Sequence, residues 1–281
     1  MNSYRSYLES SAKKYSSIVC LGLDPVLERI PVEESSIEKK IVIFFSSMLD
    51  EIVKQKVYPS AVKPNYAFYA QYGFEGLSAL KKVIDMFKSE SIPVILDSKR
   101  GDIGTTSAAY AKETFDFFQA DAVTLAPYMG YDSIEPFVTA YPDKGYYILC
   151  RTSNKTARNF QDLKCGENPL YIEVAHKLCQ WGAGGLGAVV GATYPSELED
   201  IEKCFSSYNK NIPLLIPGIG TQGGDLNAIV GILKKTDDIS VHRINSSSGI
   251  IFAHEKKKGM TFAQAAVAEL ASLNNSISAL L

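Results

Sequence analysis

The sequence has few of the side chains that build metal sites or disulfide frameworks. It contains five cysteines and three histidines; no two cysteines are spaced as Cys-x-x-Cys, and the histidines show no ligand spacing. Structural zinc sites and disulfide scaffolds both depend on such spacings. We therefore expect a reduced, cytoplasmic protein without structural zinc. The residues concerned are Cys20, Cys150, Cys165, Cys179, Cys204, His176, His242 and His254.

The chain also lacks the features of a membrane protein or a nucleic-acid-binding protein. No uninterrupted apolar stretch approaches the ~20 residues of a membrane-spanning helix. The polar start, Met1–Tyr7, has no apolar signal segment. The net charge of −2 leaves no basic footprint for nucleic acid, and the short run Lys256–Lys258 is better explained as a solvated helix end. We expect neither a membrane nor a nucleic acid as a partner.

What the chain does contain is a regular alternation of strand-like and helix-like segments over 281 residues. Short apolar runs rich in β-branched residues predict strands, at 17–25, 57–62, 92–96, 120–125, 145–150, 187–193, 212–216 and 239–244. Segments with helical periodicity lie after most of these, at 36–55, 75–89, 107–119, 133–140, 169–181, 196–206 and 261–272. The polar segment 155–168 predicts an irregular, mobile loop.

Eight such alternations favour a closed (β/α)8 TIM barrel of the α/β class over an open doubly wound sheet. A barrel commonly takes roughly 250 residues, and 46% hydrophobic residues suffice for a large core. No linker, repeat or low-complexity block divides the chain. We therefore expect a single domain over residues 1–281, with about the first 15 residues and the C-terminal helix packed outside the barrel.

The stretch 92–106 carries the strongest functional signal. Ile92–Leu96 predicts a strand that is buried on both faces, and this strand ends directly in an acid, a base and a second acid. Because side chains two residues apart in a strand point the same way, Asp97 and Lys99 should share one side. Glycines then mark a turn that brings Asp102 close. The carboxyl ends of parallel strands form the active-site face of such proteins, so we expect chemistry here.

Polar residues follow most of the other predicted strands as well. Asp24 follows the first strand, Lys63 and Asn65 the second, and Thr152 and Ser153 the fifth. A glycine-rich turn follows the seventh strand and a Ser-Gly turn the eighth. Those two loops commonly hold phosphate in barrels, with backbone N–H groups directed at the anion. A polar mouth with two lysines indicates chemistry on an anionic substrate.

The sixteen residues Leu96–Ala111, LDSKRGDIGTTSAAYA, resemble the signature of the orotidine 5′-phosphate decarboxylases with longer chains, the type 2 subfamily. The resemblance covers about residues 15 to 255 and implies the same TIM barrel. It also implies the reaction: orotidine 5′-phosphate is converted to uridine 5′-phosphate and carbon dioxide, in de novo pyrimidine biosynthesis, with no metal and no organic cofactor.

The same resemblance implies roles for the charged residues. Lys63, Asp97, Lys99 and Asp102 would form an alternating charge network, with Lys99 as the proton donor. An ammonium between carboxylates stays charged, can stabilise a carbanion at carbon 6 of the ring and can then protonate it. The enzyme would be a homodimer, and three residues would reach into the partner subunit's site: Asp102, Ile103 and Thr106.

The substrate-binding residues are implied in the same way. They are Asp24 and Asn65 at the ribose, Thr152 and Ser153 at the pyrimidine edge, Pro217 beside the pyrimidine, Gln222 on the ligand and Ser248 at the phosphate. Ser248 is a departure, because the family normally carries an Arg there that pairs with the phosphate. A bidentate ionic partner is therefore missing at this position, and Arg243 and Lys256 are nearby basic residues that could replace it.

Two other functions compete with this interpretation. A metal-dependent sugar-phosphate lyase or isomerase, such as hexulose-phosphate synthase, shares the Asp-x-Lys strand end, but the continuation Lys-Arg-x-Asp-Ile argues against it. A nucleotide-binding homologue that has lost catalysis would explain Ser248. The intact charged set of Lys63, Asp97, Lys99 and Asp102 counts against that second alternative.

Overall fold

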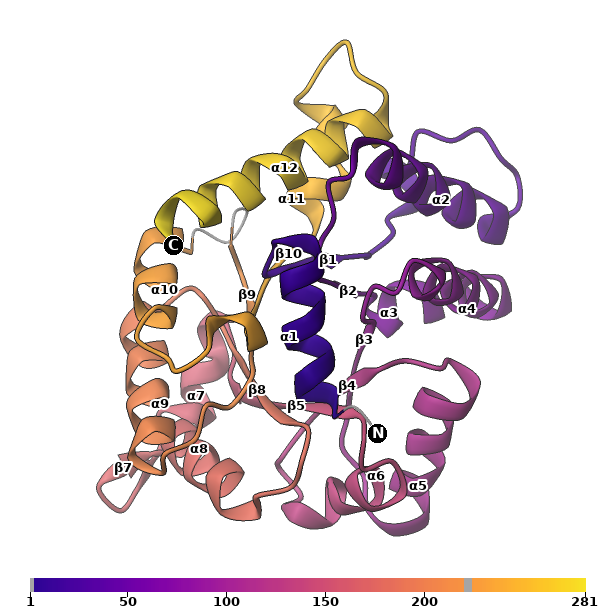
Figure 1. The fold of residues 1–281 in the computed structure, drawn as a ribbon. Helices are drawn as coiled ribbons and strands as arrows, with labels where there is room; N and C mark the ends of the chain where they lie inside the picture. Colours follow the sequence, from indigo (N-terminus) through magenta and orange to yellow (C-terminus); the bar gives the residue numbers. More distant parts are fainter. Residues whose placement is uncertain (1–2, 220–223) are drawn as a thin grey trace.

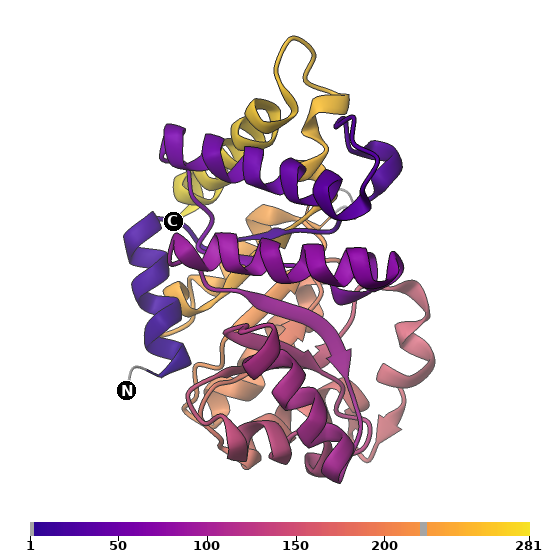
Figure 2. The same cartoon turned by 90° about the vertical axis from the view of Figure 1, so that its right-hand side faces the viewer.

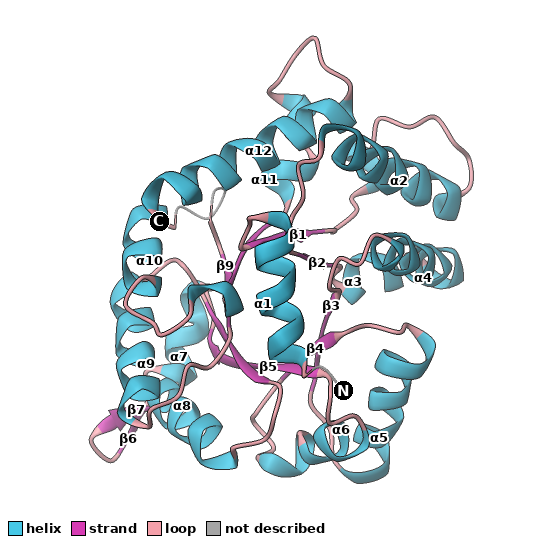
Figure 3. Ribbon diagram, viewed as in Figure 1, coloured by secondary structure: helices cyan, strands magenta, loops and turns pink. Residues whose placement is uncertain are grey.

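The computed structural model describes residues 3–219 and 224–281. Eight parallel strands form one sheet in the order β2-β1-β10-β9-β8-β5-β4-β3, and helices surround it (Figures 1 and 3). Isolated bridges join Val62 to Val94 and Asn65 to Asp97, and so connect β2 to β3. The predicted (β/α)8 barrel is confirmed. The strands are β1 Val19–Gly22, β2 Ala61–Lys63, β3 Ile95–Arg100, β4 Ala122–Leu125, β5 Gly145–Arg151, β8 Leu186–Val190, β9 Leu214–Pro217 and β10 Arg243–Ser246.

Amphipathic helices cover the outer face of the sheet. In α2, Ile37–Gln55, the Ser36 side chain accepts a hydrogen bond from the backbone N–H of Lys39 and caps the first turn. The residue after the helix, Lys56, adopts the left-handed conformation that commonly terminates helices. The other outer helices are α4 Gly73–Ser89, α5 Gly104–Lys112, α6 Glu135–Ala140, α8 Leu170–Trp181, α9 Pro195–Ser207, α10 Leu226–Leu233 and α12 Phe262–Leu280.

Inside the barrel, inward-pointing strand side chains form one apolar layer. The layer consists of Cys20, Ala61, Ile95, Ala122, Tyr147, Val189 and Leu215, joined by Tyr4 and Leu8 of α1. Helix α1, Tyr4–Tyr15, lies across the end of the barrel at which the strands begin (Figures 1 and 2). Because α1 covers that end, the carboxyl ends of the strands form the opposite, open face.

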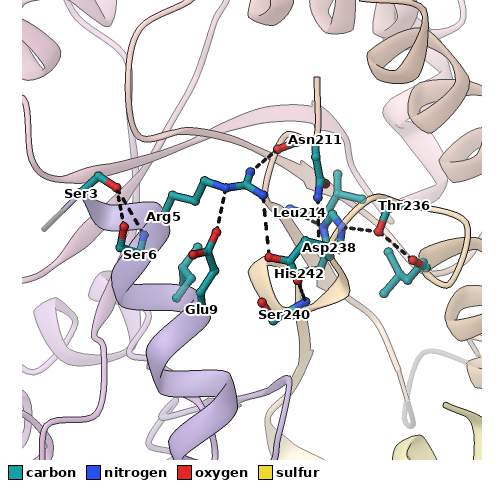
Figure 4. Close-up of polar contacts among 12 residues, drawn as sticks. Ser3, Arg5, Ser6, Glu9, Asn211, Leu214, Thr236, Asp238, Ser240 and His242 are labelled. Atoms are coloured by element: carbon teal, nitrogen blue, oxygen red, sulfur yellow. Dashed lines mark hydrogen bonds and ion pairs between the residues drawn. The ribbon is translucent and has the colours of Figure 1, made fainter. Parts of the chain in front are cut away.

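Polar contacts fasten α1 to the barrel. Arg5 donates from Nε to Glu9 Oε1 over 2.9 Å and from Nη1 to the carbonyl of Asn211 over 2.6 Å (Figure 4). The fully buried Arg243 donates from Nη2 to the carbonyl of Leu8 over 2.7 Å. Arg243 is thus engaged at the closed end of the barrel, away from the carboxyl ends of the strands.

Several strand boundaries differ from the predicted ones, because pairing within the barrel decides them rather than the local pattern. β3 continues through the charged residues to Arg100. β2 begins only at Ala61. The apolar run Ile239–Val241 forms a 3-10 turn, so β10 begins at Arg243. The prediction of a strand over 239–244 was therefore wrong in its first half.

Short elements also appear where sequence periodicity gave no signal. The segment 155–168, predicted to be irregular, contains α7 Arg158–Gln161 and β6 Lys164–Cys165, and β6 pairs antiparallel with β7 Asn168–Pro169. Two further short helices are α3 Tyr66–Ala70 and α11 Ser248–Ile251.

None of the helices in the described part of the chain combines the length and the hydropathy that a bilayer crossing requires.

Candidate active site

The carboxylate of Asp97 lies at the carboxyl end of β3 and joins side chains from three adjacent strands. Lys63 Nζ is 2.9 Å from its Oδ2, and Lys99 Nζ is 2.6 Å from its Oδ1. The Thr124 hydroxyl donates to Oδ1 over 2.9 Å, and the Asn65 amide donates to Oδ2 over 3.4 Å. Each carboxylate oxygen therefore receives one ammonium and one neutral donor.

The charges in this group stabilise one another. Burial alone would raise the pKa of Asp97, but Lys63 and Lys99 outweigh burial and hold that pKa well below its usual range. Burial alone would lower the pKa of Lys63, but Asp97 and Asp24 outweigh it and raise that pKa above its usual range. The Lys63 side chain is only 6% exposed, whereas that of Lys99 is 46% exposed. Lys99 is the more accessible of the two ammonium groups.

A distortion of β3 directs Lys99 toward Asp97. The pairing of β3 with β4 shifts register between Leu96 and Arg100, and Lys99 has a left-handed backbone with φ of 48°. This conformation costs an L-residue roughly 1–2 kcal/mol. The Lys99 N–H is satisfied there by the Thr124 hydroxyl, 2.9 Å away. Backbone strain of this kind concentrates at functional sites, and here it brings both lysine groups to one carboxylate.

Two cavities adjoin this charged group. One of about 350 Å³ is lined by Lys63, Asp97 and Lys99 together with the loop after β5. The other, of about 380 Å³, is lined by Asp24 and by the ends of β9 and β10. Lys63 and Pro217 line both cavities, so the two cavities are adjacent at the carboxyl ends of the strands. A larger cavity of about 650 Å³ lies between α1 and α12 at the closed end and contains none of these charged residues.

Asp24 connects three strand ends. Its Oδ1 accepts from the backbone N–H of Asn65 over 3.2 Å, and its Oδ2 accepts from the Ser247 hydroxyl over 2.6 Å. A Cβ built on Gly22 would lie 2.5 Å from the Cβ of Ser247, so glycine is needed for this close approach. The bonds fix Asp24 as an acceptor at the border of the 380 Å³ cavity.

Thr152 and Ser153 line the 350 Å³ cavity, as does Pro217. Gln161 of α7 accepts from the Thr152 N–H over 3.0 Å and donates to the Thr152 hydroxyl over 2.9 Å. The buried Arg151 forms an ion pair with Asp162 at 2.8 Å. The loop after β5 is thus tied to the rim of the cavity by side-chain bonds.

Asp102, Ile103 and Thr106 do not converge on the same site. The Asp102 carboxylate accepts from the neighbouring backbone N–H of Ile103 over 2.8 Å, and no ion pair joins it to Lys99 within the described residues. Ile103 is 51% exposed, and Thr106 is also exposed. Ile103 and Thr106 therefore lie on the surface, and Asp102 is half-buried.

Ser248 lines the 380 Å³ cavity, whereas Gln222 lies outside the described residues. The suggestion that Arg243 could replace the missing arginine was wrong, since Arg243 is fully buried and bonded to carbonyls at the closed end of the barrel. Lys256 is exposed and is not part of the cavity lining that the structure describes.

Sequence reasoning missed several residues of the site. Thr124 was hidden inside an apolar strand, although a single hydroxyl among apolar neighbours is a usable signal. Asn245 lies in β10 and Ser247 directly follows that strand, and both line the 380 Å³ cavity. The sequence had singled out only the Ser-Gly turn there. Arg29 lines the 380 Å³ cavity from the 3-10 turn η1, Leu27–Arg29, and no local pattern indicated this.

The sequence family described as "Orotidine 5′-phosphate decarboxylase / HUMPS family" matches residues 17–271. The chain belongs to this family. Within it, orotidine 5′-phosphate decarboxylase of Thermomicrobium roseum is 39% identical over 271 residues, which are 94% of this chain and 92% of that protein. The enzyme of the same name from Roseiflexus castenholzii is 38% identical over 284 residues, 100% of this chain and 99% of that protein.

Two solved structures agree with this assignment. The OMP decarboxylase of Leishmania donovani superimposes with a TM-score of 0.79 at 35% identity and covers 98% of both chains. The UMP synthase of the same organism superimposes with a TM-score of 0.82 at 34% identity, and the match spans all of this chain but 57% of that one. The predicted family is confirmed.

Among the described residues, no group of three or more His, Cys, Asp or Glu side chains could hold a metal ion.

Proposed function

We propose that this chain decarboxylates orotidine 5′-phosphate to uridine 5′-phosphate in pyrimidine biosynthesis, without a metal or an organic cofactor. The observation that carries the proposal is the Asp97 carboxylate held between Lys63 and Lys99, with Lys99 partly exposed on the wall of a 350 Å³ cavity. The relatives named above are orotidine 5′-phosphate decarboxylases, which supports this function over a sugar-phosphate lyase or a catalytically inactive homologue.

The reaction requires stabilisation of a carbanion. The bond between carbon 6 and the carboxylate breaks, carbon dioxide leaves, and the electron pair remains on carbon 6. The Lys99 ammonium lies where it can stabilise that charge and then transfer its proton to carbon 6, after which solvent reprotonates the amine. Asp97, negative and buried, would face the substrate carboxylate and disfavour the ground state. Lys63 keeps Asp97 charged and in place.

The two cavities suggest how the rest of the substrate binds. We assign the pyrimidine to the 350 Å³ cavity, with Thr152 and Ser153 at its edge and Pro217 beside it. The ribose lies at the border, with Asp24 and Asn65, and the phosphate occupies the 380 Å³ cavity beside Ser248. We keep Gln222 as a ligand contact on the basis of the sequence motif. Binding energy from the distant phosphate then contributes to orientation of the ring.

We further propose that the enzyme is a homodimer in which Asp102, Ile103 and Thr106 enter the partner subunit's site. Large apolar side chains support this surface as an interface, since Ile103 is 51%, Tyr128 88% and Met129 51% exposed. The two loops that carry them are neighbours, because a Cβ on Gly101 would lie 3.1 Å from the Cβ of Ala126. In a dimer with twofold symmetry through this surface, both sites would be shared in the same way, and we propose that each Asp102 then lies beside the other subunit's Lys99.

Two further proposals concern the chain as a whole. We propose that residues 1–281 form one domain, supported by the contact of α1 with the same apolar layer as the strands. We also propose a cytoplasmic location. Its support is the set of free cysteines, most of them buried, which suits a reducing compartment.

The test of the function is the loss of orotidine 5′-phosphate absorbance in the presence and in the absence of a chelator. We expect the same rate in both conditions and stoichiometric formation of uridine 5′-phosphate. Turnover that disappears with the chelator would indicate a metal-dependent reaction. No loss of substrate in either condition would contradict the proposed function.

A further inference from the structure

Arg29 lies on the wall of the cavity that contains Ser248. It is the last residue of η1, the 3-10 turn that follows β1, and it lines the 380 Å³ cavity together with Ser247, Ser248 and Phe252. Arg29 and Ser248 are therefore far apart in the sequence but border the same space. An arginine on this wall can supply the positive charge that a serine at position 248 cannot.

The guanidinium is held in place by two residues that follow β10. Its Cζ lies 3.9 Å from the centroid of the Phe252 ring, and Phe252 is buried. Its Nε donates to Glu255 Oε1 and its Nη2 to Glu255 Oε2, each over 2.7 Å. Stacking and a bidentate bond fix the plane of the group. Glu255 occupies one edge of the five-donor fork, and no other side chain or carbonyl among the described residues bonds to the group, so the Nη1 edge can donate to a second anion.

The charges in the cavity lining favour binding of an anion at Arg29 over binding at Lys63. Of the lining residues that the structure describes, Arg29 and Lys63 are positively charged. Lys63 already forms an ion pair with the buried Asp97. The Arg29 side chain is 36% exposed and its acidic partner Glu255 is 42% exposed, so solvent screens that ion pair. A phosphate in this cavity would gain more from Arg29 than from Lys63.

We propose that Arg29 binds the phosphate of the substrate, from the β1 side of the cavity, in place of the arginine that is missing at Ser248. This inference rests on the proposed function, because it takes the phosphate ester to be part of the substrate. Phe252 and Glu255 act as positioning residues that pre-organise the guanidinium.

The test compares binding of uridine 5′-phosphate and of uridine by calorimetry, which requires no turnover. Arg29→Ala should weaken binding of uridine 5′-phosphate by roughly tenfold or more, since a charged hydrogen bond to phosphate is lost, and should change uridine binding less than twofold. Arg29→Lys, which keeps the charge but not the fork, should fall between the unmodified protein and Arg29→Ala.

Arg5→Ala is a matched control. The Arg5 side chain is 38% exposed and also donates from Nε to a glutamate, but at the closed end of the barrel. This variant should bind both ligands as the unmodified protein does. Thermal unfolding of each variant checks that the fold is retained.

Two results would overturn this inference and leave the proposed function intact. One is an Arg29→Ala variant whose affinity for uridine 5′-phosphate stays within twofold of the unmodified protein. The other is an equal loss of affinity for uridine and uridine 5′-phosphate, which would mean that Arg29 only maintains the shape of the cavity. If the unmodified protein neither binds uridine 5′-phosphate nor consumes orotidine 5′-phosphate, the proposed function fails and the inference fails with it.

Discussion

The hydroxyl of Thr124 accepts a hydrogen bond from the backbone N–H of Lys99 over 2.9 Å. The same hydroxyl donates to the Asp97 carboxylate, also over 2.9 Å. One side chain of β4 therefore stabilises both the left-handed backbone of Lys99 and the charge that Lys99 faces. From this relationship we infer that Thr124 helps to hold the distorted end of β3 in place.

Replacing Thr124 with valine tests this role. Thr124→Val removes a donor to Asp97 and leaves the Lys99 N–H without an acceptor, which costs about 1–3 kcal/mol of stability. We expect kcat for orotidine 5′-phosphate to fall about tenfold, whereas Thr124→Ser, which retains the hydroxyl, should stay within twofold. Equal rates for the valine and serine variants would show that the hydroxyl does not position Lys99.

Subunit exchange tests the shared site. Lys99→Ala and Asp102→Ala should each be inactive alone. In a mixed dimer, one site collects both substitutions and the other is intact, so a one-to-one mixture should recover about a quarter of the normal activity. The measurement is turnover after exchange has been demonstrated with tagged subunits. Absence of recovery would place Asp102 in its own subunit's site or leave it with a structural role.

His242 makes stability depend on pH. Its Nδ1 accepts from the Leu214 N–H over 3.1 Å, and its Nε2 lies 3.1 Å from the Thr236 hydroxyl (Figure 4). The ring is therefore neutral. Burial, with a smaller effect of Arg243, lowers the pKa of His242 to about 3. The unfolded chain binds this proton below its ordinary pKa of ~6.5, so stability is present above that pH and is lost as the pH falls from about 6.5 toward 3.

We expect this histidine to lower the free energy of unfolding by about 2 kcal/mol at pH 5 relative to pH 8. The measurement is urea unfolding at both pH values. In His242→Asn, the new amide oxygen can still accept from the Leu214 N–H. The measured difference in the free energy of unfolding between pH 5 and pH 8 should therefore be smaller in this variant by the contribution of the histidine. A histidine-dependent difference of zero, or one of opposite sign, would mean that the folded protein tolerates the imidazolium.

Ser248→Arg tests the location of the phosphate. An arginine at this position should add a charged hydrogen bond and lower KM for orotidine 5′-phosphate by roughly tenfold. It should have much less effect with orotidine, which lacks the phosphate. In an Arg29→Ala background, the same substitution should restore the phosphate-dependent affinity. If Ser248→Arg changes KM equally for both substrates, the phosphate does not lie beside position 248.

The sequence was sufficient to predict the barrel and the grouping of Lys63, Asp97 and Lys99, for a clear physical reason, whereas Asp102 does not join that group within the chain. Lys63 and Asp97 each end a short apolar run, and the carboxyl ends of parallel strands meet at one face. Asp97 and Lys99 lie together as expected, 2.6 Å apart, although the left-handed backbone at Lys99 departs from the regular strand alternation on which that expectation was based. The signals there are local, so they can be read from a few residues.

The remaining features depend on contacts between distant segments. Arg29 comes from a turn without periodicity and is positioned by Phe252 and Glu255, which lie more than two hundred positions later in the chain. Ile239–Val241 has the composition of a strand, but it lies at the closed end of the barrel and forms a 3-10 turn. Neither outcome can be read from a local pattern, because barrel register and packing decide both.

The most direct test of the central claim is the turnover of orotidine 5′-phosphate by Lys99→Ala, measured as uridine 5′-phosphate formed per active site. The substitution removes both the cation that stabilises carbon 6 and the proton that it receives. The account predicts no turnover above the uncatalysed rate, with thermal unfolding and uridine 5′-phosphate binding retained. Near-normal turnover by this variant would contradict the proposed mechanism.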